Sequence, residues 1–367
     1  MKILYVTTIS NTVNAFLIPH IEMLINEGYD VDVAFNVEHE VKPEIYKMGC
    51  KIYSIPFQRS PLSKGNLRAY KNLRKLIVTE GYDLVHTHTP VASAIVRLVC
   101  KNLNSVRVFY TAHGFHFYKG APFLNWLVYY PVEKYLAKYT DVIITINKED
   151  FDRAKRKFKA KKIEYMPGVG IELEKIFDLK VDKKLKRKEI GVPKEAFVIL
   201  SVGELNKNKN HEKIIRALAN THNPDIHYVI CGEGVLKNRL LELAKKLKIQ
   251  NRVHFLGFRN DVMDIYKTVD LFVFPSYREG LSVALMEAMA SGLPCVVSNI
   301  RGNSDLIENE KGGFLVDPSD VNEFSNMISK YIENFHLLRT HGNFNKNKIK
   351  DFSISNVTNK IKENYIL

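Results

Sequence analysis

The sequence has few cysteines and no long apolar run. Among its 367 residues the four cysteines are far apart and lie in apolar surroundings: Cys50, Cys100, Cys231 and Cys295. Such scattered thiols are typical of a reduced protein and disfavour a disulfide framework or a zinc site. No apolar run approaches the roughly 20 residues of a membrane span. The first residues enter a strand pattern without a small-residue cleavage site, so we expect no signal peptide.

Repeats of fixed period, low-complexity tracts and a complete dinucleotide fingerprint are also missing. Gly232-Glu233-Gly234 lacks the remaining glycine of G-x-G-x-x-G, which disfavours a dehydrogenase and favours a tight turn. An apolar content of 46% and a charged content of 26% are those of a globular protein. Because 367 residues exceed one ordinary core, we expect two domains.

Acidic residues are too few to balance the basic ones, and the formal net charge is +14. Residues 1–170 contain 24 Lys and Arg against 15 Asp and Glu, a net +9, and the remainder contains 30 against 25, a net +5. The excess fits either a solvated basic surface or attraction to anionic lipid, at about 1 kcal/mol per basic residue near the membrane. No nucleic-acid motif accompanies it, so we do not expect a nucleic-acid partner.

The first half alternates near-continuous Val and Ile runs with helical patterns, which is typical of a parallel sheet covered on both faces. The predicted strands are Lys2–Thr7, Asp30–Asn36, Lys51–Phe57, Asp83–Thr87, Arg107–Ala112 and Asp141–Ile146. The predicted helices are Ala15–Glu27, Pro43–Met48, Leu67–Thr79, Ala92–Asn102 and Leu124–Tyr139. Residues 149–164 are interpreted as a charged helix and a turn.

The second half repeats this alternation after a linker near residues 167–172. Its predicted strands are Ala196–Gly203, His227–Cys231, Val253–Leu256, Asp270–Pro275, Pro294–Val297 and Gly313–Val316, and its predicted helices are His211–Asn220, Leu236–Leu247, Val262–Lys267, Leu281–Ser291 and Val321–Asn334. The expected fold class is α/β, with two Rossmann-like, doubly wound parallel-sheet domains facing a central cleft. We place the domains at 1–170 and 171–350, and expect 351–367 to form a helix that packs back on the first.

One segment, from Arg278 to Gly292, is more informative than any other. Its two carboxylates, Glu279 and Glu287, flank a glycine and an apolar helical run, and a predicted strand precedes them. A strand, a glycine turn and a helix N-terminus gather free backbone N–H groups where an anion can bind. At 1.5 Å per residue, Glu287 would lie roughly 10–12 Å along the axis from Glu279. The pattern fits a nucleotide diphosphate sugar, with one acid at the sugar and the other at the ribose.

Two other patterns have competing interpretations. His86 and His88 point the same way on a strand and could form a metal pair, but no third ligand is evident, so a structural or acceptor-loop role is favoured. Asp30-Val31-Asp32 has the D-x-D form of metal-dependent glycosyltransferases of another fold. It lies at a strand start in the first unit, and we reject that interpretation. We expect no metal.

With these residues in view, the chain resembles glycosyltransferase family 4, the retaining GT-B enzymes, over most of its length. The resemblance rests on Glu279-x7-Glu287 between strand and helix, followed by Ser291-Gly292-Leu293-Pro294. Further matching segments occur in the expected order, namely Tyr110-Thr111-Ala112-His113-Gly114, Val202-Gly203-Glu204-Leu205 with Lys209, and Cys231-Gly232-Glu233-Gly234. The run from Tyr110 to Lys148 is similar to bacterial transferases that build capsular and exopolysaccharides.

The resemblance implies roles for single residues. Glu279, His113 and Lys209 would be catalytic: Glu279 would hold the donor sugar, His113 would hydrogen-bond a sugar hydroxyl, and Lys209 would bind the donor diphosphate and stabilise the leaving group. Glu287 would bind the ribose. The remaining donor-binding residues would act mainly through their backbone, at Gly280, Leu281, Ser282, Gly203, Gly232, Gly234, Leu256 and Phe258.

The chain departs from the family pattern at two places. Glu204 stands where relatives often have Arg, so one phosphate-binding cation is missing unless Lys207 compensates. The first strand-helix loop, Thr7 to Thr12, lacks the usual Gly-Gly pair.

Residues 115–130 are rich in aromatic side chains and include Lys119. The segment is interpreted either as an ordinary buried helix with its preceding loop or as a surface that enters the membrane interface, where amphipathic aromatic residues settle. The second interpretation would place the acceptor mouth near a lipid-linked sugar and the protein at the inner face of the cytoplasmic membrane.

The sequence therefore predicts a metal-independent, retaining glycosyltransferase of bacterial surface polysaccharide synthesis. The donor would be a UDP-linked nucleotide diphosphate sugar, with an N-acetylhexosamine as one candidate for the sugar. It is a co-substrate, and no cofactor is expected. The acceptor would be a lipid-linked saccharide or oligosaccharide. The alternatives are a sugar-nucleotide 2-epimerase of similar architecture and a non-catalytic sugar-nucleotide-binding subunit.

Overall fold

The computed structural model describes residues 1–365 and contains two compact units. The N-terminal unit comprises residues 1–170 together with the chain from Ile354 onward, and the C-terminal unit comprises Ile171–Ser353. The sequence placed the linker at 167–172, and the division after residue 170 falls within it. The last two residues of the predicted segment 351–367 lie outside the described part of the chain.

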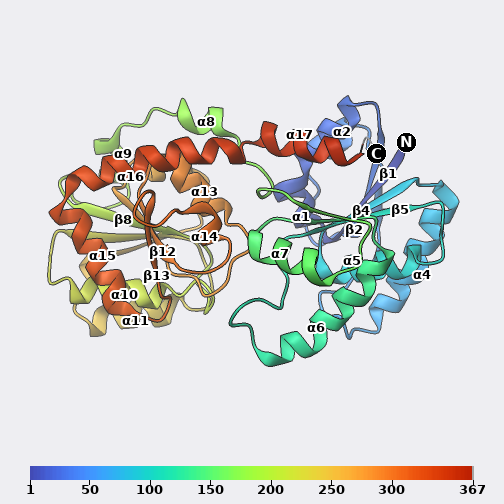
Figure 1. The fold of residues 1–367 in the computed structure, drawn as a ribbon. Helices are drawn as coiled ribbons and strands as arrows, with labels where there is room; N and C mark the ends of the chain where they lie inside the picture. Colours follow the sequence, from blue (N-terminus) through green and yellow to red (C-terminus); the bar gives the residue numbers. More distant parts are fainter. Residues whose placement is uncertain (366–367) are drawn as a thin grey trace. The chain divides into compact units, whose positions relative to one another are not determined.

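The N-terminal unit is built on a parallel sheet of seven strands in the order β3-β2-β1-β4-β5-β6-β7 (Figure 1). Its strands are β1 (Lys2–Ile9), β2 (Asp30–Asn36), β3 (Ile52–Ser54), β4 (Leu84–Thr87), β5 (Arg107–Ala112), β6 (Val142–Thr145) and β7 (Lys162–Tyr165). The central strands are buried along their whole length, as Val and Ile runs covered on both faces require. Strand β7 was not predicted, because residues 149–164 were interpreted as a charged helix and a turn.

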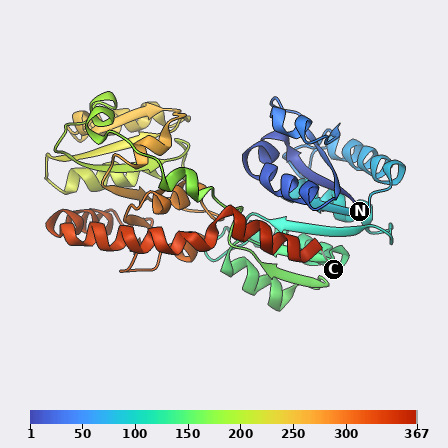
Figure 2. The same ribbon diagram turned by 90° about the horizontal axis from the view of Figure 1, so that it is seen from above.

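Helices cover both faces of this sheet. They are α1 (Ser10–Thr12), the π-helical turn η1 (Val13–Leu17), α2 (Ile18–Asn26), α3 (Pro43–Lys47), α4 (Gly65–Glu80), α5 (Pro90–Cys100), α6 (Phe123–Leu136), the 3-10 turn η2 (Ala137–Tyr139) and α7 (Lys148–Lys157). Helix α17 (Ile354–Tyr365) returns to this unit and packs against α2, so the described end of the chain lies near its beginning (Figure 2). The buried hydroxyl of Tyr365 lies 3.0 Å from that of Tyr5.

The C-terminal unit is built on a parallel sheet of six strands in the order β10-β9-β8-β11-β12-β13. Its strands are β8 (Phe197–Val202), β9 (Ile226–Cys231), β10 (Val253–Gly257), β11 (Leu271–Phe274), β12 (Cys295–Ser298) and β13 (Gly313–Val316). All six were predicted within two residues at their observed ends, because each is a short apolar run between turn residues.

The helices of the C-terminal unit pack on both faces of its sheet and form two buried clusters with it. They are α8 (Leu173–Phe177), α9 (Lys183–Glu189), α10 (His211–Asn220), α11 (Lys237–Lys246), η3 (Gln250–Arg252), α12 (Val262–Tyr266), α13 (Val283–Ala290), α14 (Asn303–Leu306), α15 (Val321–Glu333), α16 (Phe335–Lys348) and η4 (Ile349–Phe352). Helices α8, α9, α14 and α16 were not predicted from the sequence.

Within residues 1–365, no helix combines the length and the apolar character that a bilayer crossing would require.

Candidate functional site

The strand order of the C-terminal unit creates a topological switch point between β8 and β11. From β8 the chain adds β9 and β10 on one side, and it then returns to add β11 on the other. Loops that leave neighbouring strands in opposite directions open a crevice at the carboxyl ends of those strands, where ligands bind in such sheets. Lys209 follows β8 and Glu279 follows β11, so the fold brings together two residues that are 70 positions apart.

Hydrogen bonds between the two loops hold them in register. The backbone N–H of Tyr277 donates to the Asn208 carbonyl at 2.9 Å, and the Asn208 side chain donates to the Arg278 carbonyl at 2.9 Å. The Asn210 side chain donates to the Pro275 carbonyl at 3.0 Å. Asn210 also adopts a left-handed conformation with a φ of 56°, which asparagine tolerates better than most residues. These asparagines flank Lys209 and fix its backbone opposite the loop after β11.

Lys209 and Glu279 form an ion pair at this switch point. The Lys209 Nζ lies 2.7 Å from Oε1 of Glu279, and the two side chains are only 20% and 12% exposed. The ammonium also lies 4.6 Å from the centroid of the Phe274 ring. Sequence reasoning assigned these residues to one ligand but did not predict that they contact each other. Each charge of the pair is neutralised by the other. A ligand that carries both an anion and hydroxyl groups could bind the two side chains in place of this contact.

A third loop, after β12, supports the backbone beside Glu279. Arg301 Nε donates to the Glu279 carbonyl at 3.3 Å. A Cβ on Gly302 would lie 1.9 Å from the Gly280 carbonyl oxygen, and the φ of Gly302 is +80°, so only glycine allows this approach. Sequence reasoning missed Arg301 and Gly302, although an Arg-Gly pair three residues after a buried strand is a recognisable signal at the carboxyl edge of a sheet.

Helix α13 begins at Val283 rather than at Leu281. The Ser282 side chain caps it by accepting from the Leu285 N–H at 3.4 Å. Glu279 therefore lies in the loop before the helix, and the distance to Glu287 estimated from helical rise does not apply. Gly280, Leu281 and Ser282 form the turn that leads into the helix, as expected, and their backbone is the part of the chain that joins Glu279 to α13.

Glu287 lies on α13 and is half-buried. Burial raises the pKa of its carboxyl group to about 7, and a hydrogen bond with Tyr266 opposes that rise. The Tyr266 hydroxyl also donates to the Ala284 carbonyl at 2.9 Å, one turn before Glu287. Hydroxyl groups of a ligand that hydrogen-bond to this carboxylate would stabilise its ionised form, which burial disfavours.

The three predicted glycines after β8 and β9 bring their loops into contact with each other. A Cβ on Gly232 would lie 2.0 Å from the Gly203 carbonyl oxygen, and one on Gly234 would lie 2.5 Å from the Leu205 carbonyl oxygen. At Gly203 a Cβ would lie 3.1 Å from the Lys209 side chain. The packing explains why glycine stands at each position, and it places these loops beside Lys209. Glu204 is exposed, as is Lys207.

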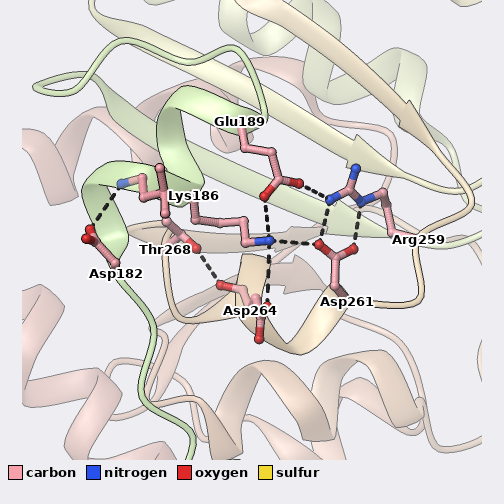
Figure 3. Close-up of polar contacts among 8 residues, drawn as sticks. Asp182, Lys186, Glu189, Arg259, Asp261, Asp264 and Thr268 are labelled. Atoms are coloured by element: carbon pink, nitrogen blue, oxygen red, sulfur yellow. Dashed lines mark hydrogen bonds and ion pairs between the residues drawn. The ribbon is translucent and has the colours of Figure 1, made fainter.

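Leu256 lies on strand β10 and is half-buried. Phe258 directly follows this strand, and its side chain is 73% exposed. A charged network holds the chain that follows (Figure 3). Lys186 on α9 contacts Asp261 at 2.9 Å and Glu189 at 2.7 Å, and Arg259 pairs with both acids.

Hydrogen bonds within this network shift its pKa values strongly. The bond to Glu189 raises the pKa of Lys186, and the bond from Arg259 lowers the pKa of Asp261. All members are therefore charged near neutral pH. The network anchors the loop after β10 to α9. The backbone around Leu256 and Phe258 is therefore fixed by contacts with α9, which lies away from the switch point.

The N-terminal unit places His113 directly after β5, beside the end of β4. Its Nε2 lies 3.3 Å from Nδ1 of His88, and the tautomer decides which nitrogen donates. Burial lowers the pKa of His113 to about 4, with a smaller contribution from the neighbouring His20. Burial also lowers the pKa of His88 well below its ordinary value. His113 is therefore neutral near pH 7 and can exchange hydrogen bonds with hydroxyl groups.

His86 and His88, the candidate metal pair, contact other side chains. His86 contacts the Tyr365 hydroxyl through Nδ1 and the Thr111 hydroxyl through Nε2 at 2.8 Å, so both ring nitrogens have partners. Its ring centroid lies 4.2 Å from that of His88. Within residues 1–365 no three His, Cys, Asp or Glu side chains are placed to hold a metal ion. Asp32 of the D-x-D sequence is buried and accepts from the Tyr82 hydroxyl at 2.6 Å.

The first strand-helix connection, which lacks the expected Gly-Gly pair, is not an open loop. Strand β1 continues through Ile9 and passes directly into α1 and the π-helical turn η1. The Thr8 N–H donates to the Thr89 hydroxyl at 2.8 Å. This contact links the ends of β1 and β4 at the switch point of the unit.

Family models match both units. The model described as "Glycosyl transferases group 1" matches residues 182–351, and "Glycosyl transferase 4-like" matches residues 2–147. The Bacillus subtilis (strain 168) protein EpsD, named as a glycosyltransferase, is 34% identical over 99% of this chain and 96% of its own length. The chain belongs to the GT-B glycosyltransferases. The Lys209–Glu279 pair lies within the region matched by the "Glycosyl transferases group 1" model.

Other relatives agree with this membership. The Escherichia coli UDP-Gal:alpha-D-GlcNAc-diphosphoundecaprenol alpha-1,3-galactosyltransferase is 31% identical over 94% of this chain and 91% of its own length. Among solved structures, HepE of Anabaena in complex with UDP and glucose has a TM-score of 0.83 at 20% identity and covers 100% of this glycosyltransferase and 99% of HepE. The lipopolysaccharide glycosyltransferase WaaG has a TM-score of 0.76 at 16% identity and covers 98% of both chains. At these identities the structures show the shared fold.

Proposed function

We propose that this glycosyltransferase is retaining and metal-independent, and that it transfers a sugar from a UDP-linked donor to a lipid-linked saccharide. The observation that carries the proposal is the Lys209–Glu279 ion pair, 2.7 Å long, at the switch point between β8 and β11. A diphosphate sugar presents an anion to the lysine and hydroxyl groups to the carboxylate, and so satisfies both partners when it separates them.

The donor would lie across the turn that leads into α13. Lys209 would stabilise the negative charge that grows on the departing diphosphate, and it would supply the positive charge that a metal ion supplies in other transferases. Glu279 would bind hydroxyls of the transferred sugar, and Glu287 would bind the ribose. Phe258, with its exposed ring on an anchored loop, would contact the base. No cofactor is required in this scheme.

The reaction would proceed on one face of the sugar. The bond between the anomeric carbon and the phosphate oxygen breaks, the bond to the acceptor oxygen forms on the same side, and the acceptor proton passes to the leaving phosphate. No protein nucleophile takes part, so Glu279 binds and orients the sugar without bonding to it. The neutral His113 would hydrogen-bond a hydroxyl near the reacting carbon and position it.

The named relatives support the choice of donor and acceptor. The Escherichia coli relative uses UDP-Gal and a diphosphoundecaprenol-linked acceptor. A Campylobacter jejuni relative, 36% identical over 42% of this chain, is named as an N-acetylgalactosaminyltransferase that acts on a diphospho-undecaprenol-linked sugar. Transfer to such an acceptor in surface polysaccharide synthesis would place the enzyme at the inner face of the cytoplasmic membrane as a peripheral protein.

Two measurements test the proposal. A thermal-shift panel of UDP, GDP and ADP sugars should show stabilisation by UDP sugars only. In the presence of EDTA, UDP release should require a diphosphoundecaprenol-linked acceptor, and the product should retain the donor's anomeric configuration. Donor conversion without an acceptor would instead indicate an epimerase, donor binding without turnover would indicate a non-catalytic subunit, and loss of the rate in EDTA would contradict metal independence.

A further inference from the structure

Helix α6 is apolar on both of its sides. Its inner side packs on the unit through Trp126, whose ring centroid lies 5.8 Å from those of Phe117 and Tyr130. Glu133 also faces inward and forms an ion pair with the buried Arg97 at 2.8 Å. A helix that is apolar all around normally has both sides covered. The inner side of α6 is covered by its own unit, and the outer side is not.

The outer side presents six large apolar side chains, which we call the outer face of α6. They are Phe123 (79% exposed), Leu124 (65%), Leu127 (61%), Val128 (45%), Val132 (46%) and Tyr135 (44%). At 100° per residue these positions share one half of the helix. The aromatic residues that suggested a membrane contact in the sequence lie largely elsewhere: Phe115 and Phe117 are in the core, and Trp126 is half-buried.

The exposed charges on α6 and just beyond its end are basic. Between residues 115 and 140, Glu133 is the only acidic residue, and it is buried against Arg97. Lys134 is exposed, and at 100° per residue it falls in the same half of α6 as the outer face. Lys138, in the 3-10 turn η2 that follows α6, is exposed as well. Lys119, in the loop before α6, is exposed, and its backbone N–H donates to Glu149 at 2.7 Å, so an acid is present at that end of the helix. An apolar face with lysines on it and beyond its C-terminal end is complementary to a surface with apolar material beneath negative charge.

We propose that the outer face of α6 docks on an anionic lipid bilayer, with Phe123 and the aliphatic residues entering the headgroup boundary and the lysines contacting lipid phosphates. This inference rests on the proposed function, because a lipid-linked acceptor lies in such a bilayer. A second copy of this chain fits the face less well, since a two-fold contact through it would bring the same lysines near each other.

Cosedimentation of the full chain with vesicles tests the docking without turnover. The protein should bind vesicles of phosphatidylcholine with phosphatidylglycerol and leave vesicles of phosphatidylcholine alone largely unbound. The double substitution Phe123→Ser and Leu127→Ser should reduce the partition coefficient at least about tenfold, because two large apolar side chains no longer leave water. Lys134→Gln with Lys138→Gln should reduce it about fivefold per lysine at low salt, and high salt should remove that difference.

The matched control is Phe335→Ser with Leu185→Ser, two residues of the C-terminal unit whose side chains are 67% and 66% exposed. This variant should bind vesicles like the parent. Equal loss in both double variants, or no binding of the parent to anionic vesicles, would overturn the proposal. Unchanged vesicle binding together with a shift from dimer to monomer in Phe123→Ser/Leu127→Ser would assign the face to a second copy instead. Donor-induced thermal shifts, measured on every variant, report separately on folding and on the proposed function.

Discussion

The two units share a strand arrangement and differ in the chemistry at its switch point. Each sheet begins in its middle, extends one way for two strands and then turns back, at β1/β4 in one unit and at β8/β11 in the other. The C-terminal unit places a lysine and a carboxylate there, 2.7 Å apart. At the ends of β4 and β5, the N-terminal unit places His88 and His113, whose pKa values are lowered by burial.

The difference shows that topology supplies the crevice and side chains decide what it binds. A charged pair suits a ligand with a diphosphate and hydroxyls, since it offers full charges to both. Neutral imidazoles in a partly dehydrated setting offer hydrogen bonds without attracting a second anion. Under the proposed function, the C-terminal unit would bind the nucleotide and the N-terminal unit an uncharged saccharide surface.

The largest expected effect is a loss of stability in acid. Buried histidines cause it in both units, since burial also lowers the pKa of His211 and His254 in the C-terminal unit to about 4, and the contrast between the units comes from Glu287. Burial lowers the pKa of His20 and His113 to about 4 from 6.5. Their neutral forms therefore stabilise the N-terminal unit fully above pH 6.5, and this contribution is lost as the pH falls towards 4. At pH 5 the loss from these two groups would be about 4 kcal/mol, at ~1.4 kcal/mol per pH unit each.

The contribution of Glu287 to stability has the opposite pH dependence. Its folded pKa, about 7, lies above its ordinary value, so its contribution is complete below pH 4.5 and is lost as the pH rises through 7. Hydrogen exchange at pH 7 and pH 5, corrected for intrinsic rates, should show β4 and β5 losing protection in acid while α13 keeps it. A loss of protection in α13 equal to that in β4 and β5 would contradict the opposite pH dependence assigned to Glu287.

The next largest effect is expected at the charged switch point. Lys209→Ala should lower kcat by about 10²–10³-fold, because the leaving diphosphate loses a preorganised cation. The control is Lys207→Ala, which removes an exposed lysine two residues away and should leave kcat near the parent value. A large loss in Lys207→Ala would mean that this lysine replaces the Arg absent at position 204. Acceptor-dependent UDP release is the assay for both.

A smaller effect is expected at the neutral switch point. His113→Ala should lower kcat about 10- to 100-fold, the equivalent of one well-placed hydrogen bond in the transition state. Because the pKa of His113 is about 4, the group stays neutral and its contribution should not change between pH 6 and pH 8. His113→Asn, which keeps a hydrogen-bonding side chain, should recover part of the rate. A pH-rate profile that loses an ionisation near pH 6.5 in His113→Ala would contradict a neutral role.

The smallest effect concerns donor affinity. Donor hydroxyls bound to Glu287 favour its ionised form, so affinity should rise with pH below about 7, by at most about tenfold per pH unit, and then level off. Calorimetric titration of UDP sugar between pH 5.5 and pH 8.5 measures this dependence. In Glu287→Gln the dependence should disappear. An unchanged profile in that variant would separate the ionisation from the proposed ribose contact.

Local sequence was a good guide wherever one physical signal dominated. The buried strands were predicted because their Val and Ile runs permit little else, and Glu279 and Glu287 stood out because glycine and an apolar helix lie between them. Strand β7 was missed because all four of its residues are half-buried and two of them, Lys162 and Glu164, are charged. The sequence left two interpretations open for residues 115–130, because aromatic content does not tell which side of a helix faces inward.

By itself, the sequence determined the alternation of strands and helices and the two-domain organisation, and it singled out candidate residues for a diphosphate sugar, since these depend on periodicity, glycine and charge within short stretches. Only the tertiary structure decided that Lys209 and Glu279 pair, that Arg301 and Gly302 support their loop, and that α6 has an uncovered apolar side. Those facts depend on which strands become neighbours and on which side chains the packed core leaves in water, and both are set by contacts between residues far apart in the chain.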